Sequence, residues 1–202
     1  ISNTSGSFIV TSRMNVYDGF PYPYGFGVNE RDGMKPDLAE PLKLIEILHN
    51  KMGMEMIDIT AGNPYVNPHV NRPADIMAYE CEHPLKGVER LVDCARVIQH
   101  AFEDLVVIGS GLSYLRQFSA NLAAGAVENR YFSIAGFGRQ SFAYPDFAND
   151  LLKKGFLDPK KCCITCGKCT QLMRTTGKAG CAVRDEVYTG IYNQARACST
   201  PL

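Results

Sequence analysis

Four cysteines near the C-terminus have the type and spacing of metal ligands. Two residues separate Cys163 from Cys166 and Cys166 from Cys169, and eleven separate Cys169 from Cys181. Three thiolates at this spacing can wrap an iron–sulfur cluster that a remote fourth cysteine closes. Zinc ribbons usually pair two CxxC knuckles across a longer span, and the sequence has no second knuckle. We therefore expect an iron–sulfur site, with zinc or no metal as the alternatives.

The remaining cysteines indicate a reducing compartment. Five of the eight cysteines crowd into residues 162–181, and Cys81, Cys94 and Cys198 are scattered. A secreted disulfide framework replaces a missing core, whereas 202 residues with 46% hydrophobic side chains can form their own core. We expect a cytoplasmic protein whose thiolates bind a metal, with a purely disulfide-bonded set as the alternative, and in which Cys162 is a spare that could substitute for the first ligand. Basic side chains near the cluster would offset its negative charge: Lys160, Lys161, Lys168 and Lys178.

Two glycine-rich segments follow apolar runs and have the composition of phosphate-binding loops. Gly109, Ser110 and Gly111 open directly into a helical pattern, and Gly138 and Arg139 follow the next apolar run. Glycines let backbone amides approach an anion, and an arginine adds bidentate hydrogen bonds to a phosphate. Tight strand-to-helix turns also require glycine. The pair together predicts a phosphate site, and a pair of plain turns is the alternative.

Arg13 follows the apolar run FIVTS, near the expected end of a strand. A charge in this position is costly to bury unless it meets a partner. Arg13 therefore either faces an anion or electron-rich ring at the strand ends, or it is a surface side chain just past the strand.

The elements that must position these residues alternate between strand and helix. Parallel strands joined by crossover helices are typical of this order. Four units are half of an eight-unit barrel, and a doubly wound sheet fits the order as well. The expected strands span 7–11, 54–60, 105–108 and 131–135, and the expected helices span 37–51, 85–102, 113–128 and 147–154.

Charge and hydropathy exclude two classes of partner. The 21 basic and 21 acidic residues balance, whereas a nucleic-acid surface needs a concentrated positive field. The sequence has no run of 18 apolar residues that would span a membrane. We expect two parts, a half-barrel over residues 1–158 and a cysteine-rich tail over residues 159–202.

Several motifs together resemble the NADH:flavin oxidoreductases of the old yellow enzyme family. They are ITAGNPYVNPHVNRP, VVIGSGLSYLRQF, GFGRQSFAYPDFANDLLKKG and CITCGKCTQLMR, and the resemblance extends from about Phe8 to Cys181. The most similar subgroup carries a cysteine cluster after the barrel and includes 2,4-dienoyl-CoA reductase. That subgroup typically has three residues, not two, between its second and third cysteines.

The resemblance implies the C-terminal half of a (β/α)₈ barrel that binds FMN at the carboxyl ends of its strands. It implies that Arg13 faces the flavin pyrimidine edge and that the cysteines hold a 4Fe-4S cluster, which relays electrons to the flavin. The implied FMN-phosphate residues are Gly109, Ser110, Gly111, Gly138 and Arg139, and the implied cluster ligands are Cys163, Cys166, Cys169 and Cys181.

The same resemblance implies that important parts lie outside this chain. In the family, the first four strands carry the pair that polarises the substrate carbonyl and the tyrosine that donates a proton. We expect the parent protein to reduce activated alkenes with NAD(P)H or an electron carrier, and this part to be inactive alone. The expected partner is the N-terminal half of the same polypeptide, or a second copy of this chain. A non-catalytic electron-transfer or zinc-stabilised structural domain is the alternative function.

Overall fold

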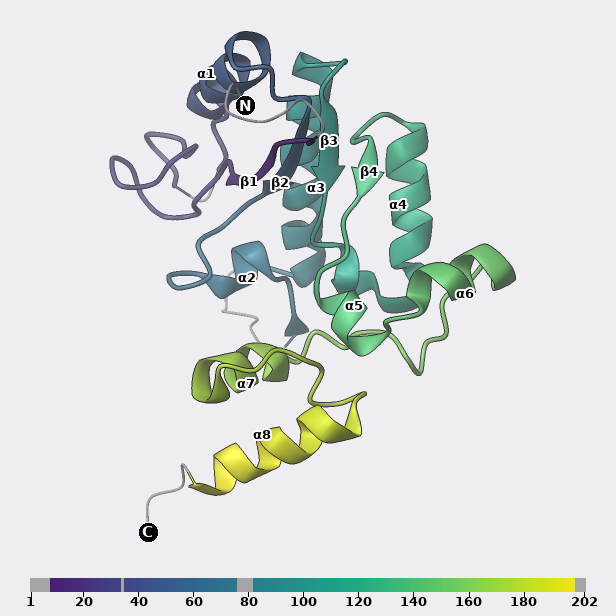
Figure 1. The fold of residues 1–202 in the computed structure, drawn as a ribbon. Helices are drawn as coiled ribbons and strands as arrows, with labels where there is room; N and C mark the ends of the chain where they lie inside the picture. Colours follow the sequence, from purple (N-terminus) through teal and green to yellow (C-terminus); the bar gives the residue numbers. More distant parts are fainter. Residues whose placement is uncertain (1–7, 34, 76–81, 199–202) are drawn as a thin grey trace. The chain divides into compact units, whose positions relative to one another are not determined.

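A computed structural model describes residues 8–33, 35–75 and 82–198 (Figure 1). The chain divides into two compact units. Unit 1 comprises residues 1–112 and 121–136, and unit 2 comprises residues 113–120 and 137–202. The expected boundary between 158 and 159 separates functions and stays a prediction. The structural boundary places the segment after Gly136 in the same unit as the cysteines.

Unit 1 contains a four-stranded parallel sheet in the order β1-β2-β3-β4. This α/β architecture confirms the parallel sheet expected from the sequence and is compatible with half of a (β/α)₈ barrel. The strands are β1 (Thr11–Asn15), β2 (Met56–Thr60), β3 (Val106–Gly109) and β4 (Ile134–Ala135).

One face of the sheet is buried beneath helix α3 (Pro84–Ala101), which contacts β2 and β3. Ile57, Ile59 and Val107 on the strands are at most 1% exposed. The helix buries side chains that recur at helical spacing: Val88, Leu91, Val92, Ala95 and Ile98. Burial of these two apolar surfaces against each other forms the core of unit 1.

The opposite face of the sheet is more open. The register places Arg13, Asp58, Ile108 and Ile134 in one row across the four strands. None of the four is buried, and Ile134 is 42% exposed. Within the described residues, β1 and β4 each pair on one side only.

Helices connect the strands of unit 1 and make up most of unit 2. Those before β3 are α1 (Ala39–Glu46), the π-helical η1 (Ile47–Lys51), α2 (Pro68–Asn71) and α3. Those after β3 are the 3-10 helix η3 (Leu112–Phe118), α4 (Ser119–Glu128), α5 (Arg139–Ala143), α6 (Phe147–Lys154), α7 (Lys168–Thr176) and α8 (Glu186–Cys198). No helix in the described ranges is both long and apolar enough to cross a membrane.

The first strand differs from the expectation. The predicted strand spans 7–11, of which residue 7 lies outside the described residues, and β1 instead begins at Thr11. Its pairing with β2 decides this, because Thr11 to Asn15 oppose Met56 to Thr60. The apolar residues that suggested the earlier start are left uncovered, with Phe8 72% and Ile9 71% exposed.

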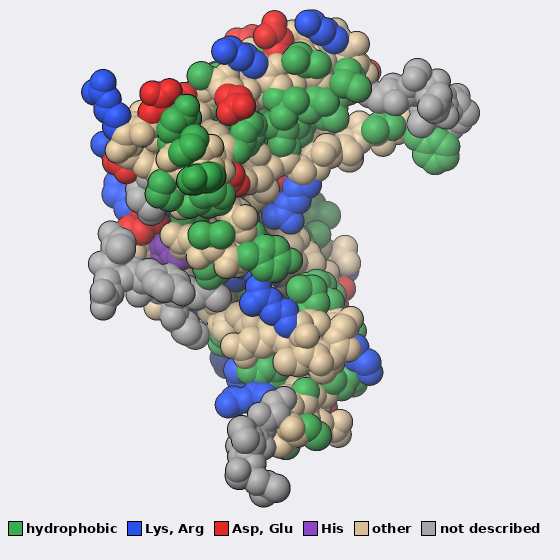
Figure 2. Space-filling view, turned by 90° about the vertical axis from the view of Figure 1, so that its left-hand side faces the viewer, with side chains coloured by type: hydrophobic (Ala, Val, Ile, Leu, Met, Phe, Trp, Pro, Cys, Tyr) green, Lys and Arg blue, Asp and Glu red, His purple; other side chains and the backbone are tan. Residues whose placement is uncertain are grey.

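One part of the surface carries side chains of both charges. In the upper part of Figure 2, acidic and basic side chains are mixed with hydrophobic ones instead of being gathered by sign. This mixture agrees with the equal numbers of acidic and basic residues.

A substitution of Gly109, at the end of β3, would test how tightly the core of unit 1 is packed. A Cβ at this position would overlap the ring of Phe132, which is 1% exposed. We expect Gly109→Ala to lower the free energy of unfolding by about 1–3 kcal/mol, as overpacking does. Urea unfolding measures this.

Gly125→Ala is the matched control, because Gly125 lies in helix α4 and a Cβ there would meet no atom within 4 Å. We expect this change to stabilise by about 0.5–1 kcal/mol through helix propensity. Equal effects of the two alanines would contradict the packing described for Gly109.

Candidate metal centre

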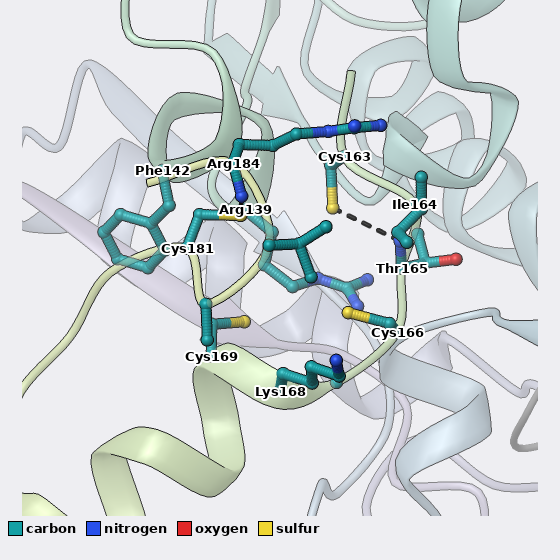
Figure 3. A pocket seen from close by; sticks show the side chains of 13 residues that line it. Arg139, Phe142, Cys163, Ile164, Thr165, Cys166, Lys168, Cys169, Cys181 and Arg184 are labelled. Carbon is teal, nitrogen blue, oxygen red and sulfur yellow. Dashed lines mark hydrogen bonds between the residues drawn. The ribbon is translucent and has the colours of Figure 1, made fainter. Parts of the chain in front are cut away.

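The four predicted cysteine ligands line a single pocket in unit 2. Figure 3 shows the sulfur atoms of Cys163, Cys166, Cys169 and Cys181 pointing toward the same space. The loop that carries the first two cysteines supplies one side, α7 supplies the third, and the loop before α8 supplies the fourth. The structure thus brings together all four residues that the spacing selected.

Left-handed backbone turns curl the first loop around the pocket. Thr165 has φ +52° and Gly167 has φ +74°, so the chain reverses between consecutive cysteines. Gly167 suits its position because a side chain is disfavoured in that region. Helix α7 begins at the next residue and places Cys169 in its first turn. The backbone N–H of Thr165 donates to Cys163 Sγ at 3.4 Å.

Cys181 reaches the pocket because α7 and α8 pack together. Leu172 on α7, Tyr192 on α8 and Ala182 form a buried cluster. The Tyr192 hydroxyl also donates to Gln171 Oε1 at 2.5 Å. This small core fixes the loop between the helices, and with it the cysteine that is most distant in sequence.

Gln140 in α5 anchors the cysteine loop, and the sequence analysis did not single it out. Its side chain is fully buried, its Nε2 donates to Cys162 Sγ at 3.5 Å, and its Oε1 accepts from the Cys163 N–H at 2.9 Å. The only signal in the sequence is its place directly after Arg139, which does not reveal a contact 22 or 23 residues away.

Positive charge surrounds the thiols. Arg139, Lys168 and Arg184 line the same pocket. Burial raises the pKa of Cys163, and the Thr165 N–H and the Arg139 charge partly offset this rise. The pKa of Cys163 nevertheless stays above its ordinary value, so these two contacts only limit the cost of forming the thiolate that a metal would bind.

All seven cysteines in the described residues are free, and Cys81 lies outside them. Cys162, expected to be a spare ligand, instead packs in a core cluster with Tyr144 and Leu157. Among the described residues, no three His, Cys, Asp or Glu side chains form a group that would hold one metal ion. Whether the four cysteines hold a metal, and which one, therefore stays a prediction.

Arg13 lies within β1, in unit 1, and forms an ion pair with Asp58 of β2. Its Nε is 3.5 Å from Asp58 Oδ2, and its Nη2 is 3.4 Å from Thr60 Oγ1. The Arg13 side chain nevertheless remains 62% exposed. Burial raises the pKa of Asp58, and the neighbouring Arg13 charge offsets part of that rise. Whether Arg13 faces a flavin stays a prediction.

The predicted phosphate residues fall in both units. Gly109 is the last residue of β3 in unit 1, and Ser110 and Gly111 follow it; Ser110 Oγ donates to Ile59 O at 3.3 Å. Packing alone accounts for two of the glycines, because a Cβ at Gly109 would overlap Phe132 and one at Gly111 would meet Leu91 at 2.5 Å.

Gly138 and Arg139 belong to unit 2, where a Cβ at Gly138 would meet no atom within 4 Å. Packing in the described structure therefore does not require a glycine there. Arg139 lines the cysteine pocket. A phosphate site that joins the two segments stays a prediction.

A second charged cluster in unit 1 surrounds His69, which is 3% exposed. Its Nε2 is 3.4 Å from Glu82 Oε1, and Glu82 forms an ion pair with Arg90. The Arg90 guanidinium also lies over the Tyr17 ring. Burial lowers the pKa of His69, which favours the neutral imidazole. This cluster ties α2 to α3.

Comparisons with known proteins add no assignment, because no family model, curated protein or solved structure matches the chain. The resemblance to the old yellow enzyme family, FMN binding and the cluster therefore stand as proposals.

Loss of the Gln140 anchor should destabilise unit 2. Gln140→Leu keeps the side chain's size but leaves the Cys163 N–H without its acceptor, so we expect a loss of about 1–3 kcal/mol in the free energy of unfolding. Chemical denaturation of the metal-free protein measures this. Gln194→Leu, at an exposed position of α8, is the matched control and should change stability by about 0.5 kcal/mol or less. A Gln140 variant as stable as the control would mean that the two hydrogen bonds do not hold the loop.

Proposed function

We propose that this chain is the C-terminal part of an FMN-dependent NAD(P)H oxidoreductase that reduces activated alkenes and carries a 4Fe-4S cluster. One observation carries the proposal: four cysteines selected by their spacing line a single pocket with their sulfur atoms directed inward (Figure 3). The proposed setting is the cytoplasm, where thiols stay reduced.

The donor set of the pocket fits an iron–sulfur cluster. Soft thiolates are the ligands that such clusters take, one for each iron atom of a 4Fe-4S centre. Backbone N–H groups point at two of the sulfurs, because the Arg184 backbone N–H donates to Cys181 Sγ at 3.4 Å, as Thr165 N–H does to Cys163. Hydrogen bonds to sulfur and nearby cations stabilise the negative charge of a thiolate-bound cluster.

The flavin half of the proposal rests on Arg13 and on the resemblance of the glycine segments. Asp58 and Thr60 hold the Arg13 side chain on the open face of the sheet, and most of it stays accessible. A guanidinium held in this way can stabilise negative charge on a bound ring. When bound, FMN would accept hydride from NAD(P)H and deliver it to the alkene.

The alternative is a non-catalytic domain in which the cysteines carry electrons or hold zinc as a structural element. The four cysteines lie in the loop before α7, in α7 and in the segment before α8, so a bound ion would also crosslink these three parts of the chain. Zinc requires its four sulfurs about 3.8 Å apart, which follows from tetrahedral Zn–S bonds of about 2.3 Å.

We further propose that four more strand–helix units of the same polypeptide complete the sheet. A closed barrel has no edges, whereas β1 and β4 each lack a second neighbour among the described residues. The open face also leaves apolar side chains partly exposed, including Ile108 and Ile134. Catalytic groups for the carbonyl and the proton would then come from those units, and this chain alone would not turn over.

Anaerobic purification tests the metal centre. We expect about four iron atoms per chain, with the broad visible absorption of an iron–sulfur protein. Cys166→Ser should lose the iron, and Cys198→Ser should keep it, because Cys198 is exposed and does not line the pocket. Added FMN should bind to the wild-type protein and more weakly to Arg13→Gln.

A colourless protein with one zinc per chain would contradict the cluster and favour the structural alternative. Iron binding with no affinity for FMN would support the electron-transfer alternative instead. Enone reduction by the isolated chain would contradict the proposal that further units are needed.

The open sheet face should make the isolated chain associate. We expect light scattering to show self-association that grows with concentration, since half-exposed apolar side chains lack a cover. Ile134→Lys on β4 should weaken the association, whereas Val127→Lys on α4 should not, although the two residues are 42% and 41% exposed. A discrete dimer would identify a second copy as the occupant, and a monomer at all concentrations would contradict an interface on this face.

A further inference from the structure

Arg139 lies in the cysteine pocket, although its sequence context suggested a phosphate ligand. Its side chain is partly buried and lines the pocket with the four cysteines. In Figure 3 its guanidinium extends into the region between Cys163 and Cys166.

The backbone of Arg139 is fixed relative to the cysteine loop. Arg139 is the first residue of α5, and the next residue, Gln140, is fully buried and hydrogen-bonded to Cys162 and Cys163. The contacts of Gln140 therefore hold the backbone of Arg139 beside the cysteine loop. The fold thus fixes where the Arg139 side chain leaves helix α5, and its place in the lining of the cysteine pocket follows from that position.

The other two cations of the pocket are already engaged. Arg184 donates from Nε and Nη2 to the Cys162 carbonyl at 3.4 and 3.3 Å, and in Figure 3 its guanidinium points away from the sulfurs. Lys168 Nζ lies 5.5 Å from the centre of the Tyr192 ring. Within the described part of the chain, the Arg139 guanidinium has no hydrogen-bond or ion-pair partner of its own.

A guanidinium among thiolates acts through its charge and its donors. It stays protonated at any physiological pH and has five N–H donors and no acceptor. Partial burial strengthens its interaction with negative charge, because less water screens the pair. Any ligand that becomes more negative in this pocket is therefore stabilised by Arg139.

We propose that the positive charge of Arg139 raises the reduction potential of a cluster bound by the four cysteines, so that the cluster is easier to reduce. The inference rests on the proposed function, since it requires the 4Fe-4S cluster. One-electron reduction adds one negative charge to the cluster–thiolate unit, and the adjacent guanidinium stabilises the reduced form more than the oxidised form. Net charge and hydrogen bonds to sulfur are among the features that set the potentials of such clusters.

The test is a potentiometric titration of the anaerobically prepared protein, with iron content measured first and the electron supplied by mediators at a controlled potential. We expect Arg139→Gln to lower the reduction equilibrium constant of the cluster at least about tenfold, a shift of about 59 mV toward negative potential for one electron. Arg139→Lys keeps the charge without the planar fork and should fall nearer to the wild-type potential. Arg184→Gln is the matched control and should shift the constant less than about threefold, because that guanidinium faces a carbonyl outside the pocket.

An unchanged potential in Arg139→Gln, or an equal shift in Arg184→Gln, overturns the inference while the cluster itself stands. Weaker FMN binding at an unchanged potential also overturns it and assigns Arg139 to the phosphate. If Arg139→Gln takes up no iron, Arg139→Lys decides. If Arg139→Lys holds a cluster whose potential is close to that of the wild type, the result supports the electrostatic role of Arg139. A shift of about 59 mV in Arg139→Lys, or loss of its iron, overturns that role. A wild-type protein without a cluster overturns the proposed function and this inference together.

Discussion

The buried amide of Gln140 holds the cysteine loop against helix α5, and the geometry of the cysteine pocket depends on that contact. One side chain satisfies both the Cys163 N–H and the Cys162 sulfur. A buried polar group is tolerated only when it is paired, so the loop and the helix must keep one relative position. The same contact fixes Arg139, the neighbouring residue, at the pocket. A hydrogen-bonded glutamine therefore holds the start of the cysteine loop and places Arg139 beside it.

The second constraint is the parallel register of unit 1. Pairing of β1 with β2 sets Arg13 opposite Asp58, and pairing with β3 and β4 continues that row with Ile108 and Ile134. The row combines the Arg13–Asp58 ion pair with two apolar side chains. The described residues cover this face of the sheet only in part. Such a face suits the interior of a barrel mouth, where charge and apolar surface both meet a ligand or further strands. The proposed flavin site and the proposed missing units thus depend on the same surface.

The proposed cysteine site and the proposed flavin-phosphate site both require positively charged side chains beside them. Thiolates need positive charge beside them, and the cysteine pocket has three cations along its walls. A flavin phosphate would also need positive charge, and Arg139 is the residue that both expectations select. Its contact with the cysteine site is present in the structure of unit 2, whereas the phosphate role rests on resemblance. This difference is why the electrostatic role at the cysteines is the more direct inference.

Local sequence determined the number of strand–helix units, the parallel order and the four cysteines of the pocket. These depend on apolar periodicity and on ligand spacing, which are properties of neighbouring residues. The tertiary structure decided the position of β1, because strand pairing outweighed the apolar run at Phe8 and Ile9. It also decided that Cys162 enters a core, that Gln140 anchors the loop and that Arg139 joins the thiols. These contacts join residues that are distant in the sequence, and no local pattern records which distant partner a side chain will meet once the helices pack.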